Sequence, residues 1–207
     1  ARQPRIQRLD RRFPVDLAVV DGRCGGAIGL NEMTGERTVL PASAVVLSTG
    51  GAGQVYARTT NPGNATGDGM AMALRAGALL MDMEFVQFHP TSLYLPSSPP
   101  FLLSEAIRGE GGQLRNIKGE LFMHRYHPDG ALAPRDVVSR AIWSEMAATR
   151  ARHVYLDVTH LGAAFVKRRF PTIYATCLRY DIDMTEEWIP VSPSAHYMMG
   201  GVWTDVQ

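Results

Sequence analysis

The chain has 207 residues, with 21 Lys and Arg against 20 Asp and Glu, so its formal net charge is +1. Apolar residues make up 45% and charged residues 20%, which is typical of a folded globular protein rather than a disordered one. The balanced charge gives no reason to expect a nucleic-acid partner. No apolar run reaches the ~20 residues that span a membrane, and two cysteines cannot build a disulfide framework. We expect a cytoplasmic protein with no membrane or nucleic-acid partner.

The first third of the chain predicts short strands joined by turns. Three apolar-rich runs predict strands: residues 15–20, 27–30 and 37–40. Residues 44–48 (AVVLS) are a continuous apolar run, which predicts a strand of the buried type. A glycine cluster, TGGAG, follows at residues 49–53. Glycines directly after a buried strand let the backbone approach a ligand closely.

A helix is predicted next, over residues 69–80 (GMAMALRAGALL), which are rich in Ala, Met and Leu. We expect this helix to pack on most of its faces. Asp68 falls at its start, where a carboxylate can either cap free backbone N–H groups or anchor a polar ligand. The local sequence favours the cap.

The second half predicts a further strand at 83–88, before His89, and a longer helix. Pro134 occupies the first helical turn, its preferred place, and an apolar stripe at helical spacing follows it. Arg135 thus lies in a first turn, where the helix dipole disfavours a cation, and this hints at function. Later segments are predicted as follows: a strand at 154–158, two short helical stretches around Pro171, and an irregular segment at 188–204.

Six sequence blocks occur in a fixed order from about residue 44 to the C-terminus. They are TGDGMAMALRAGA (66–78), EFVQFHPT (84–91), LLSEAIRGEGG (102–112), LAPRDVVSRAI (132–142), YLDVTHLG (155–162) and AHYMMGGV (195–202). This set resembles the flavoprotein family of succinate dehydrogenase, fumarate reductase and L-aspartate oxidase. Within that family the chain is most similar to the L-aspartate oxidases, because of the APRD form of the arginine motif and the stretch 170–197.

The resemblance implies an α+β fold that combines the capping domain of a fumarate reductase-like flavoprotein with part of its α/β FAD-binding domain. Residues 1–82 are then the rear part of the FAD-binding domain, and residues 83–197 are the capping (substrate) domain. Residues 198–207 begin the return to the FAD-binding domain. The family's GxGxxG fingerprint does not occur in the 207 residues.

The resemblance also implies site residues and a cofactor. Arg135 matches the family's proton donor or acceptor. Four residues match positions that bind a C4 dicarboxylate or amino-acid substrate such as L-aspartate or fumarate: His89, Ser104, Glu105 and His196. The cofactor that the resemblance implies is FAD, and in the family its flavin takes the hydride, because no side chain can. Its contacts are expected at Thr49, Gly50, Gly51 and Asp68.

An arginine needs help to exchange a proton, because its pKa exceeds ~12. A neighbouring carboxylate must relay or offset the charge, and the candidates are Asp136, Glu105 and Glu110. Arg108 can be read as an ordinary ion-pair partner of Glu105 or Glu110. His124 and His127 have the spacing of helical metal ligands but no third ligand nearby, so no metal site is expected.

The predicted function is FAD-dependent oxidation of L-aspartate to iminoaspartate, which the resemblance places in NAD biosynthesis through quinolinate. The first alternative is the flavoprotein subunit of a fumarate reductase or succinate dehydrogenase. An alternative from another class is an inactive fragment that binds dicarboxylates. We expect the 207 residues alone to be inactive.

Overall fold

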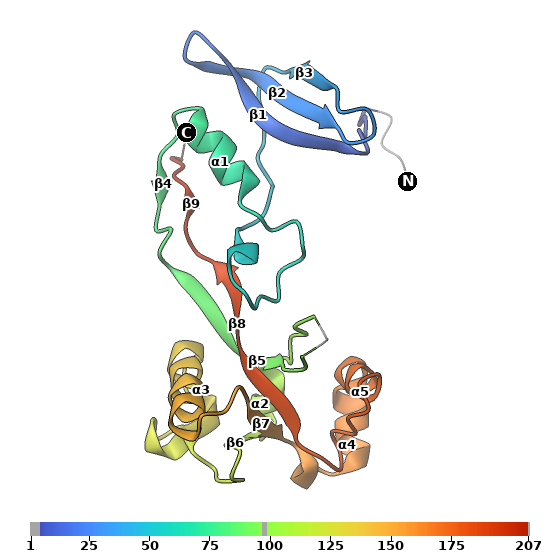
Figure 1. The fold of residues 1–207 in the computed structure, drawn as a ribbon, viewed down its shortest axis with the longest axis vertical. Coiled ribbons are helices and arrows are strands. Elements are labelled where there is room, and N and C mark those ends of the chain that lie inside the picture. Colours follow the sequence, from blue (N-terminus) through green and yellow to red (C-terminus); the bar gives the residue numbers. More distant parts are fainter. Residues whose placement is uncertain (1–4, 97–98, 207) are drawn as a thin grey trace. The chain divides into compact units, whose positions relative to one another are not determined.

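The computed structural model describes residues 5–96 and 99–206, so predictions that fall on residues 1–4, 97–98 and 207 lie outside the described residues. The chain divides into two compact units, whose elements are labelled in Figure 1. The first unit contains Ala1–Ala52, Gly63–Phe85 and Met198–Gln207, and the second contains Gly53–Pro62 and Val86–Tyr197. Residues 53–62, expected with the first stretch of the chain, therefore group with the second unit.

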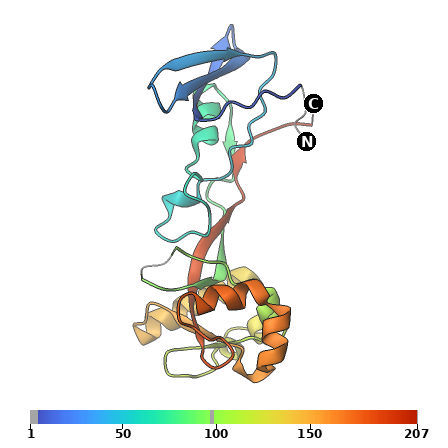
Figure 2. The ribbon, with the colours of Figure 1, turned by 90° about the vertical axis from the view of Figure 1, so that its right-hand side faces the viewer.

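The first unit contains a three-stranded antiparallel sheet in the order β1-β2-β3 (Figure 2). Its strands are β1 (Arg12–Val20), β2 (Arg23–Asn31) and β3 (Arg37–Pro41), which confirms the three predicted runs. Gly26 of β2 allows the backbone of β3 to approach closely. Its φ is +149°, and a Cβ there would lie 2.2 Å from the carbonyl oxygen of Leu40. Only glycine fits this position.

The prediction of a buried strand over residues 44–48 is wrong. Within the described ranges no strand pairs with this run, and Val46 is 86% exposed. A continuous apolar run shows that a segment is suited to burial. A strand also requires a neighbouring strand to exchange backbone hydrogen bonds, and that is not encoded in the run itself.

The helix predicted over residues 69–80 is shorter and packs on one face only. It is α1 (Asp68–Arg75), whose buried residues are Gly69, Met72 and Ala73. Gly77, at φ +92°, ends it in a left-handed turn in which the Ala78 N–H donates to the Ala73 carbonyl. The next residues form β4 (Leu80–Met81), which pairs with β9 (Gly201–Val202).

The cap prediction for Asp68 is also wrong. The residue that precedes the helix is Gly67, in a left-handed conformation with φ +83°, and no side chain caps the helix there. The Asp68 carboxylate instead accepts a hydrogen bond from the Thr66 hydroxyl.

The second unit contains a four-stranded sheet in the order β5-β8-β7-β6. Its strands are β5 (Val86–Leu93), β6 (Gln113–Arg115), β7 (Val154–Asp157) and β8 (Ile189–Met198). β7 is antiparallel to both β6 and β8. β5 runs on through His89, so the expectation that the strand ends before His89 is wrong.

The irregular segment predicted for residues 188–204 is also wrong, because most of it is β8. This segment contains two prolines, Pro190 and Pro193, and proline cannot donate a backbone hydrogen bond to a sheet. Their carbonyl groups can still accept, and the Tyr94 N–H donates to the Pro190 carbonyl at 2.9 Å. Pro190 also takes its place in the register opposite Tyr155 of β7.

Helices pack around this sheet, and in Figure 1 β8 runs between α3 and the α4–α5 pair. The helices are α2 (Ala106–Gly109), α3 (Arg135–Thr149), α4 (Ala163–Arg169) and α5 (Pro171–Leu178). Short 3-10 turns lie at Gly53–Val55, Met123–Arg125, Gly130–Leu132 and Thr159–Leu161. The predicted helix after Pro134 and the two helices around Pro171 are confirmed. Among the residues that the structure describes, no helix is both long and apolar enough to cross a membrane.

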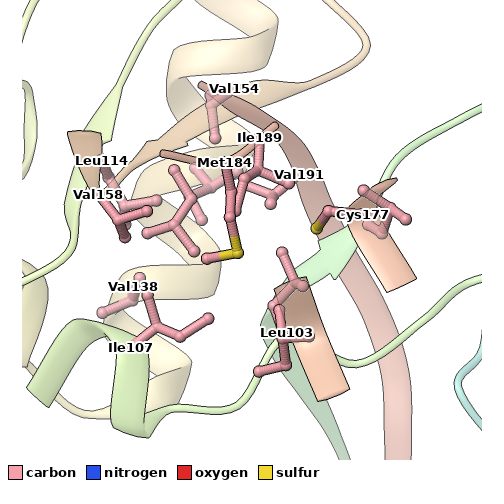
Figure 3. Close-up of a cluster of buried hydrophobic side chains, with 14 of the residues drawn as sticks. Leu103, Ile107, Leu114, Val138, Val154, Val158, Cys177, Met184, Ile189 and Val191 are labelled. Atoms are coloured by element: carbon pink, nitrogen blue, oxygen red, sulfur yellow. The ribbon is translucent and has the colours of Figure 1, made fainter. Parts of the chain in front are cut away.

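The core of the second unit joins the sheet to α2 and α3 (Figure 3). Ile107 of α2 and Val138 of α3 are both 0% exposed, as are Leu156 and Ile189 of the sheet. Burying each such side chain contributes roughly 1.5–3 kcal/mol. This packing fixes where α2 and the first turn of α3 lie, and these two places carry the polar cluster described next.

Candidate functional site

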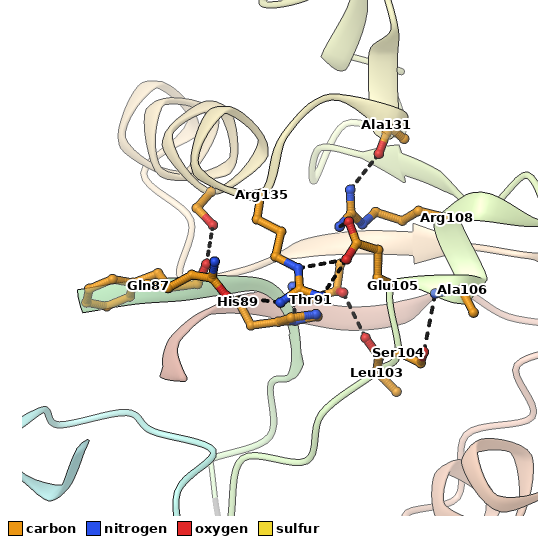
Figure 4. A network of polar contacts seen from close by, with 12 residues as sticks. Gln87, His89, Thr91, Leu103, Ser104, Glu105, Ala106, Arg108, Ala131 and Arg135 are labelled. Atoms are coloured by element: carbon orange, nitrogen blue, oxygen red, sulfur yellow. Dashed lines mark hydrogen bonds and ion pairs between the residues drawn. The ribbon is translucent and has the colours of Figure 1, made fainter. Parts of the chain in front are cut away.

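Three charged side chains meet in the second unit, with Glu105 between two arginines (Figure 4). The Nε and Nη2 atoms of Arg135 lie 2.7 and 2.6 Å from Glu105 Oε2. Nη2 of Arg108 lies 3.2 Å from the other carboxylate oxygen, Oε1. One carboxylate therefore bridges two guanidinium groups, one on each of its oxygens.

The two arginines differ in their exposure. The Arg108 side chain is 1% exposed, and its Nη1 donates to the Ala131 carbonyl at 2.6 Å. The Arg135 side chain is 34% exposed, and its Nη1 donates to Gln87 Oε1 at 3.0 Å. The Arg135 guanidinium thus contacts Glu105 and Gln87 and is partly open to solvent, whereas Arg108 is enclosed.

Electrostatics keep Glu105 ionised. Burial works to raise the pKa of Glu105, but the hydrogen bond from Arg135 and the charges of Arg108 and Arg135 outweigh it and hold that pKa below its ordinary value. Burial lowers the pKa of Arg108. Since Glu105 is 45% exposed, solvent screens the attraction, and the cluster is not a large source of stability.

His89 lies next to this cluster and is 1% exposed. Burial, together with the positive charge of Arg135, lowers the pKa of His89 to about 4, so its ring is neutral near pH 7. The backbone N–H of Thr91 donates to His89 Nδ1 at 3.3 Å. Because Nδ1 accepts, the ring proton is on Nε2, which is therefore a hydrogen-bond donor.

His196 of β8 lies against His89, with ring centroids 5.4 Å apart. Burial and the charge of Arg135 also lower the pKa of His196. Its Nδ1 is 2.8 Å from the Thr60 hydroxyl oxygen, and its backbone carbonyl accepts from Asn61 Nδ2 at 2.7 Å. Two neutral histidines thus stand beside a guanidinium, a combination of donors that suits a carboxylate ligand.

Three carboxylates were considered as partners for Arg135, and the structure shows which of them contacts it. Glu105 contacts it, whereas Asp136 pairs with Arg140 at 2.7 Å and Glu110 pairs with Arg169 at 2.8 Å. Ser104 adjoins the cluster, and its hydroxyl oxygen accepts the Ala106 N–H at 3.3 Å. Its own O–H proton stays available for donation.

Sequence reasoning missed Gln87 and Thr60 and read Arg108 only as an ion-pair partner. Gln87 carried a usable signal, because it lies two residues before His89 and residues i and i+2 of a strand share a face. No local sequence signal pointed to Thr60, because its partner His196 lies 136 residues away in the chain.

The predicted cofactor residues lie in the first unit, where the loop at 49–52 packs on the start of α1. A Cβ on Gly69 would lie 1.8 Å from Thr49 Oγ1, and the Gly67 N–H donates to the Gly51 carbonyl at 3.1 Å. Gly50 has φ +75°, and nothing lies within 4 Å of where its Cβ would be.

These residues fit a phosphate-bearing cofactor such as FAD. Among residues 5–96 and 99–206, the amides of Gly50 and Gly51 donate no hydrogen bond to the protein. Backbone amides without a protein acceptor, beside a helix N-terminus with its positive partial charge, suit a diphosphate. Asp68 adds a carboxylate that can accept from a hydroxyl group. Within the described part of the chain, no group of three or more His, Cys, Asp or Glu could hold a metal ion.

Known proteins resemble this chain over almost its whole length. The chain is 49% identical to the L-aspartate oxidase of Pseudomonas aeruginosa over 210 residues, covering 99% of this chain and 39% of that protein. It is 53% identical to the L-aspartate oxidase of Streptomyces coelicolor, covering 97% of this chain and 36% of that protein. The chain therefore spans well under half the length of these relatives.

Solved structures agree. A quinol fumarate reductase of E. coli superposes with a TM-score of 0.86 at 43% identity, covering 96% of this chain and 37% of that one. A Mycobacterium smegmatis Sdh1 complex superposes with a TM-score of 0.79 at 42% identity, covering 94% and 33%. The fold is thus a mixed α/β region of a fumarate reductase-like flavoprotein, and the chain is a homologue of the L-aspartate oxidases. The family model described as FAD binding domain matches residues 1–207, and the chain belongs to that family.

Proposed function

We propose that the full-length protein oxidises L-aspartate to iminoaspartate with FAD, and that this reaction serves NAD biosynthesis through quinolinate. In this proposal the second unit is the capping (substrate) domain and the first unit is part of the FAD-binding domain. The observation that carries the proposal is the cluster of Arg135, Glu105 and Arg108 beside two neutral histidines. The homology to L-aspartate oxidases over nearly the whole chain supports the choice of substrate.

His89 and His196 bind the carboxylates of the substrate in this proposal, and Ser104 adds a hydroxyl donor. A carboxylate only accepts hydrogen bonds, and a neutral imidazole whose Nδ1 accepts must donate through Nε2. His89 meets this condition because the Thr91 N–H occupies its Nδ1. Such contacts hold the substrate throughout the reaction and set its orientation.

Arg135 handles the proton. FAD, when bound, accepts the hydride from the substrate carbon. A guanidinium can exchange a proton only if the resulting charge is compensated. Glu105 offers this compensation, because its Oε2 contacts Arg135 and its Oε1 contacts Arg108. A change of charge at Arg135, when a proton leaves or enters it, can therefore be compensated by the Glu105 carboxylate.

Thr49, Gly50, Gly51 and Asp68 hold FAD in this proposal. The support is the glycine backbone packed on the start of α1, where the structure leaves the amides of Gly50 and Gly51 without acceptors in the described residues. Asp68 would accept a hydroxyl of the cofactor in place of its present bond from Thr66.

The second candidate is the flavoprotein subunit of a fumarate reductase or succinate dehydrogenase. The TM-score of 0.86 with the E. coli quinol fumarate reductase favours it. The same donors bind fumarate or succinate as readily as aspartate, because all three are C4 dicarboxylates. The two candidate functions differ in whether the substrate carries an amino group, as L-aspartate does, or lacks one, as succinate and fumarate do.

The test is to give the purified full-length protein L-aspartate, succinate or fumarate in separate reactions. The proposal expects L-aspartate to be consumed with formation of its imine, detected as ammonia and oxaloacetate after hydrolysis. Turnover of succinate without turnover of L-aspartate would favour the second candidate. A protein that retains FAD and turns over none of the three would contradict both.

A further inference from the structure

A short segment of the second unit, residues 58–61, lies along β8 and is hydrogen-bonded to it. The Ala195 N–H donates to the Arg58 carbonyl, and the Thr60 N–H donates to the Ala195 carbonyl, both at 3.0 Å. The Asn61 side chain also donates to the carbonyl of His196. The segment therefore follows the backbone on which His196 stands.

Tight packing against Gly53 also restricts this segment. A Cβ on Gly53 would lie 2.0 Å from Asn61 Oδ1 and 2.8 Å from Thr59 Oγ1. Thr59 is 8% exposed and its hydroxyl donates to the Ala195 carbonyl at 2.9 Å. Because Thr59 and Asn61 on either side of it in the chain are held in this way, the Thr60 hydroxyl stays at 2.8 Å from His196 Nδ1.

The tautomer of His196 depends on which partner of this contact donates. A neutral imidazole carries one proton, on Nδ1 or on Nε2. If Nδ1 donates to Thr60, Nε2 has a lone pair and repels a carboxylate. If Thr60 donates to Nδ1, Nε2 carries the proton and can bind one. The hydroxyl of Thr60 can rotate to donate, and the second arrangement matches that of His89, whose Nδ1 also accepts.

We propose that Thr60 is a positioning residue that donates its hydroxyl proton to His196 Nδ1 and thereby fixes Nε2 of His196 as a donor to a substrate carboxylate. This inference rests on the proposed function only for the identity of the ligand, a dicarboxylate. The state of the His196 ring without ligand follows from Thr60 alone. Thr60 itself does not touch the substrate in this scheme.

The experiment uses the full-length protein with three variants. Thr60→Val keeps the shape and removes the hydroxyl, and Thr60→Ser restores a hydroxyl. Thr176→Val on α5 is the matched control, because the Thr176 hydroxyl donates to the Thr172 carbonyl of its own helix and has no other partner among the described residues. Histidine ring ¹⁵N chemical shifts report the tautomer of His196 without ligand, and a His196→Gln variant assigns the signal. Calorimetric titration with succinate then measures the dissociation constant.

We expect His196 to be protonated on Nε2 in the wild type, in Thr60→Ser and in Thr176→Val. In Thr60→Val the two tautomers should mix, and the dissociation constant for succinate should rise about three- to tenfold, the effect of one ordinary hydrogen bond. Thr60→Ser should recover most of the affinity.

Two results would overturn the proposal. One is an Nδ1-protonated His196 in the wild type. The other is a Thr60→Val protein whose His196 tautomer is the same as in the wild type. Failure of the wild type to bind succinate would count against the proposed function instead, and the ring shifts would still decide the role of Thr60.

Discussion

Replacing Arg135 by lysine tests the proton-transfer assignment most sharply among the single substitutions. Arg135 holds Glu105 through Nε and Nη2 and Gln87 through Nη1, at 2.6–3.0 Å. Lysine keeps the positive charge, but one ammonium cannot reproduce these fixed, planar contacts. The Arg135→Lys protein should therefore bind a dicarboxylate, but the lysine should not hold its proton in position for transfer to the substrate.

We expect kcat for fumarate reduction to fall by about 100-fold at saturating substrate, the usual scale for a positioned acid or base. This fall corresponds to about 2.7 kcal/mol of transition-state stabilisation. Fumarate reduction is the better assay, because a proton must be delivered to carbon in that direction. The assay is steady-state turnover with a reduced artificial donor, at equal FAD content.

Arg140→Lys is the matched control, since Arg140 lies on the same helix and pairs with Asp136 at the surface. It should turn over at the wild-type rate. The reasoning would be refuted by an Arg135→Lys protein with near-wild-type kcat and a raised KM, because Arg135 would then only clamp a carboxylate.

Three further outcomes follow from the structure. His89→Ala and His196→Ala should each raise KM for the dicarboxylate about tenfold to hundredfold with a smaller effect on kcat, because each removes a charge-assisted hydrogen bond. If steady-state kinetics show an unchanged KM in both variants, the two histidines are structural. Burial lowers the pKa of His89 from 6.5 to about 4, so between these pH values the unfolded chain binds more protons than the folded one. The melting temperature should therefore fall as the pH falls through this window, and His89→Gln should make that fall less steep. A slope that is unchanged in His89→Gln would count against a buried neutral His89. Gly69→Ala should lower the ratio of FAD to protein measured by absorbance, because its Cβ would meet Thr49 Oγ1 at 1.8 Å. Gly63→Ala is the control and should retain FAD, because nothing lies within 4 Å of its Cβ. Equal retention in both would argue that the loop at residues 49–52 does not hold the cofactor.

Local patterns predicted the elements whose formation depends on nearby residues. The helix after Pro134 was predictable, because a proline start and an apolar stripe are both local signals. The two helices around Pro171 and the three N-terminal strands were predictable for the same reason. These patterns also placed Arg135 correctly in a first helical turn.

Features that depend on distant partners were not predictable from local sequence. β8 forms despite Pro190 and Pro193, and the Pro190 carbonyl accepts a hydrogen bond from the Tyr94 N–H. Residues 44–48, by contrast, have the composition of a strand but no pairing strand among the described residues. Asp68 has the right residue type for a cap, yet a left-handed Gly67 occupies that place.

The candidate site shows the same division. Motifs predicted its residues, because the blocks at 84–91, 102–112, 132–142 and 195–202 carry His89, Glu105, Arg135 and His196. The choice of Glu105 over Asp136 and Glu110 could not, because it depends on how α2 packs against the first turn of α3. The contact between Thr60 and His196 joins residues far apart in sequence and emerges only from the fold.

The central claim is that His89, His196 and Arg135 together form the dicarboxylate site. A crystal structure of the full-length protein with FAD and succinate tests it most directly. We predict that one or both succinate carboxylates accept hydrogen bonds from Nε2 of His89 and of His196, with the Arg135 guanidinium beside the ligand. Succinate bound elsewhere, with the two histidines contacting only protein, would contradict the account.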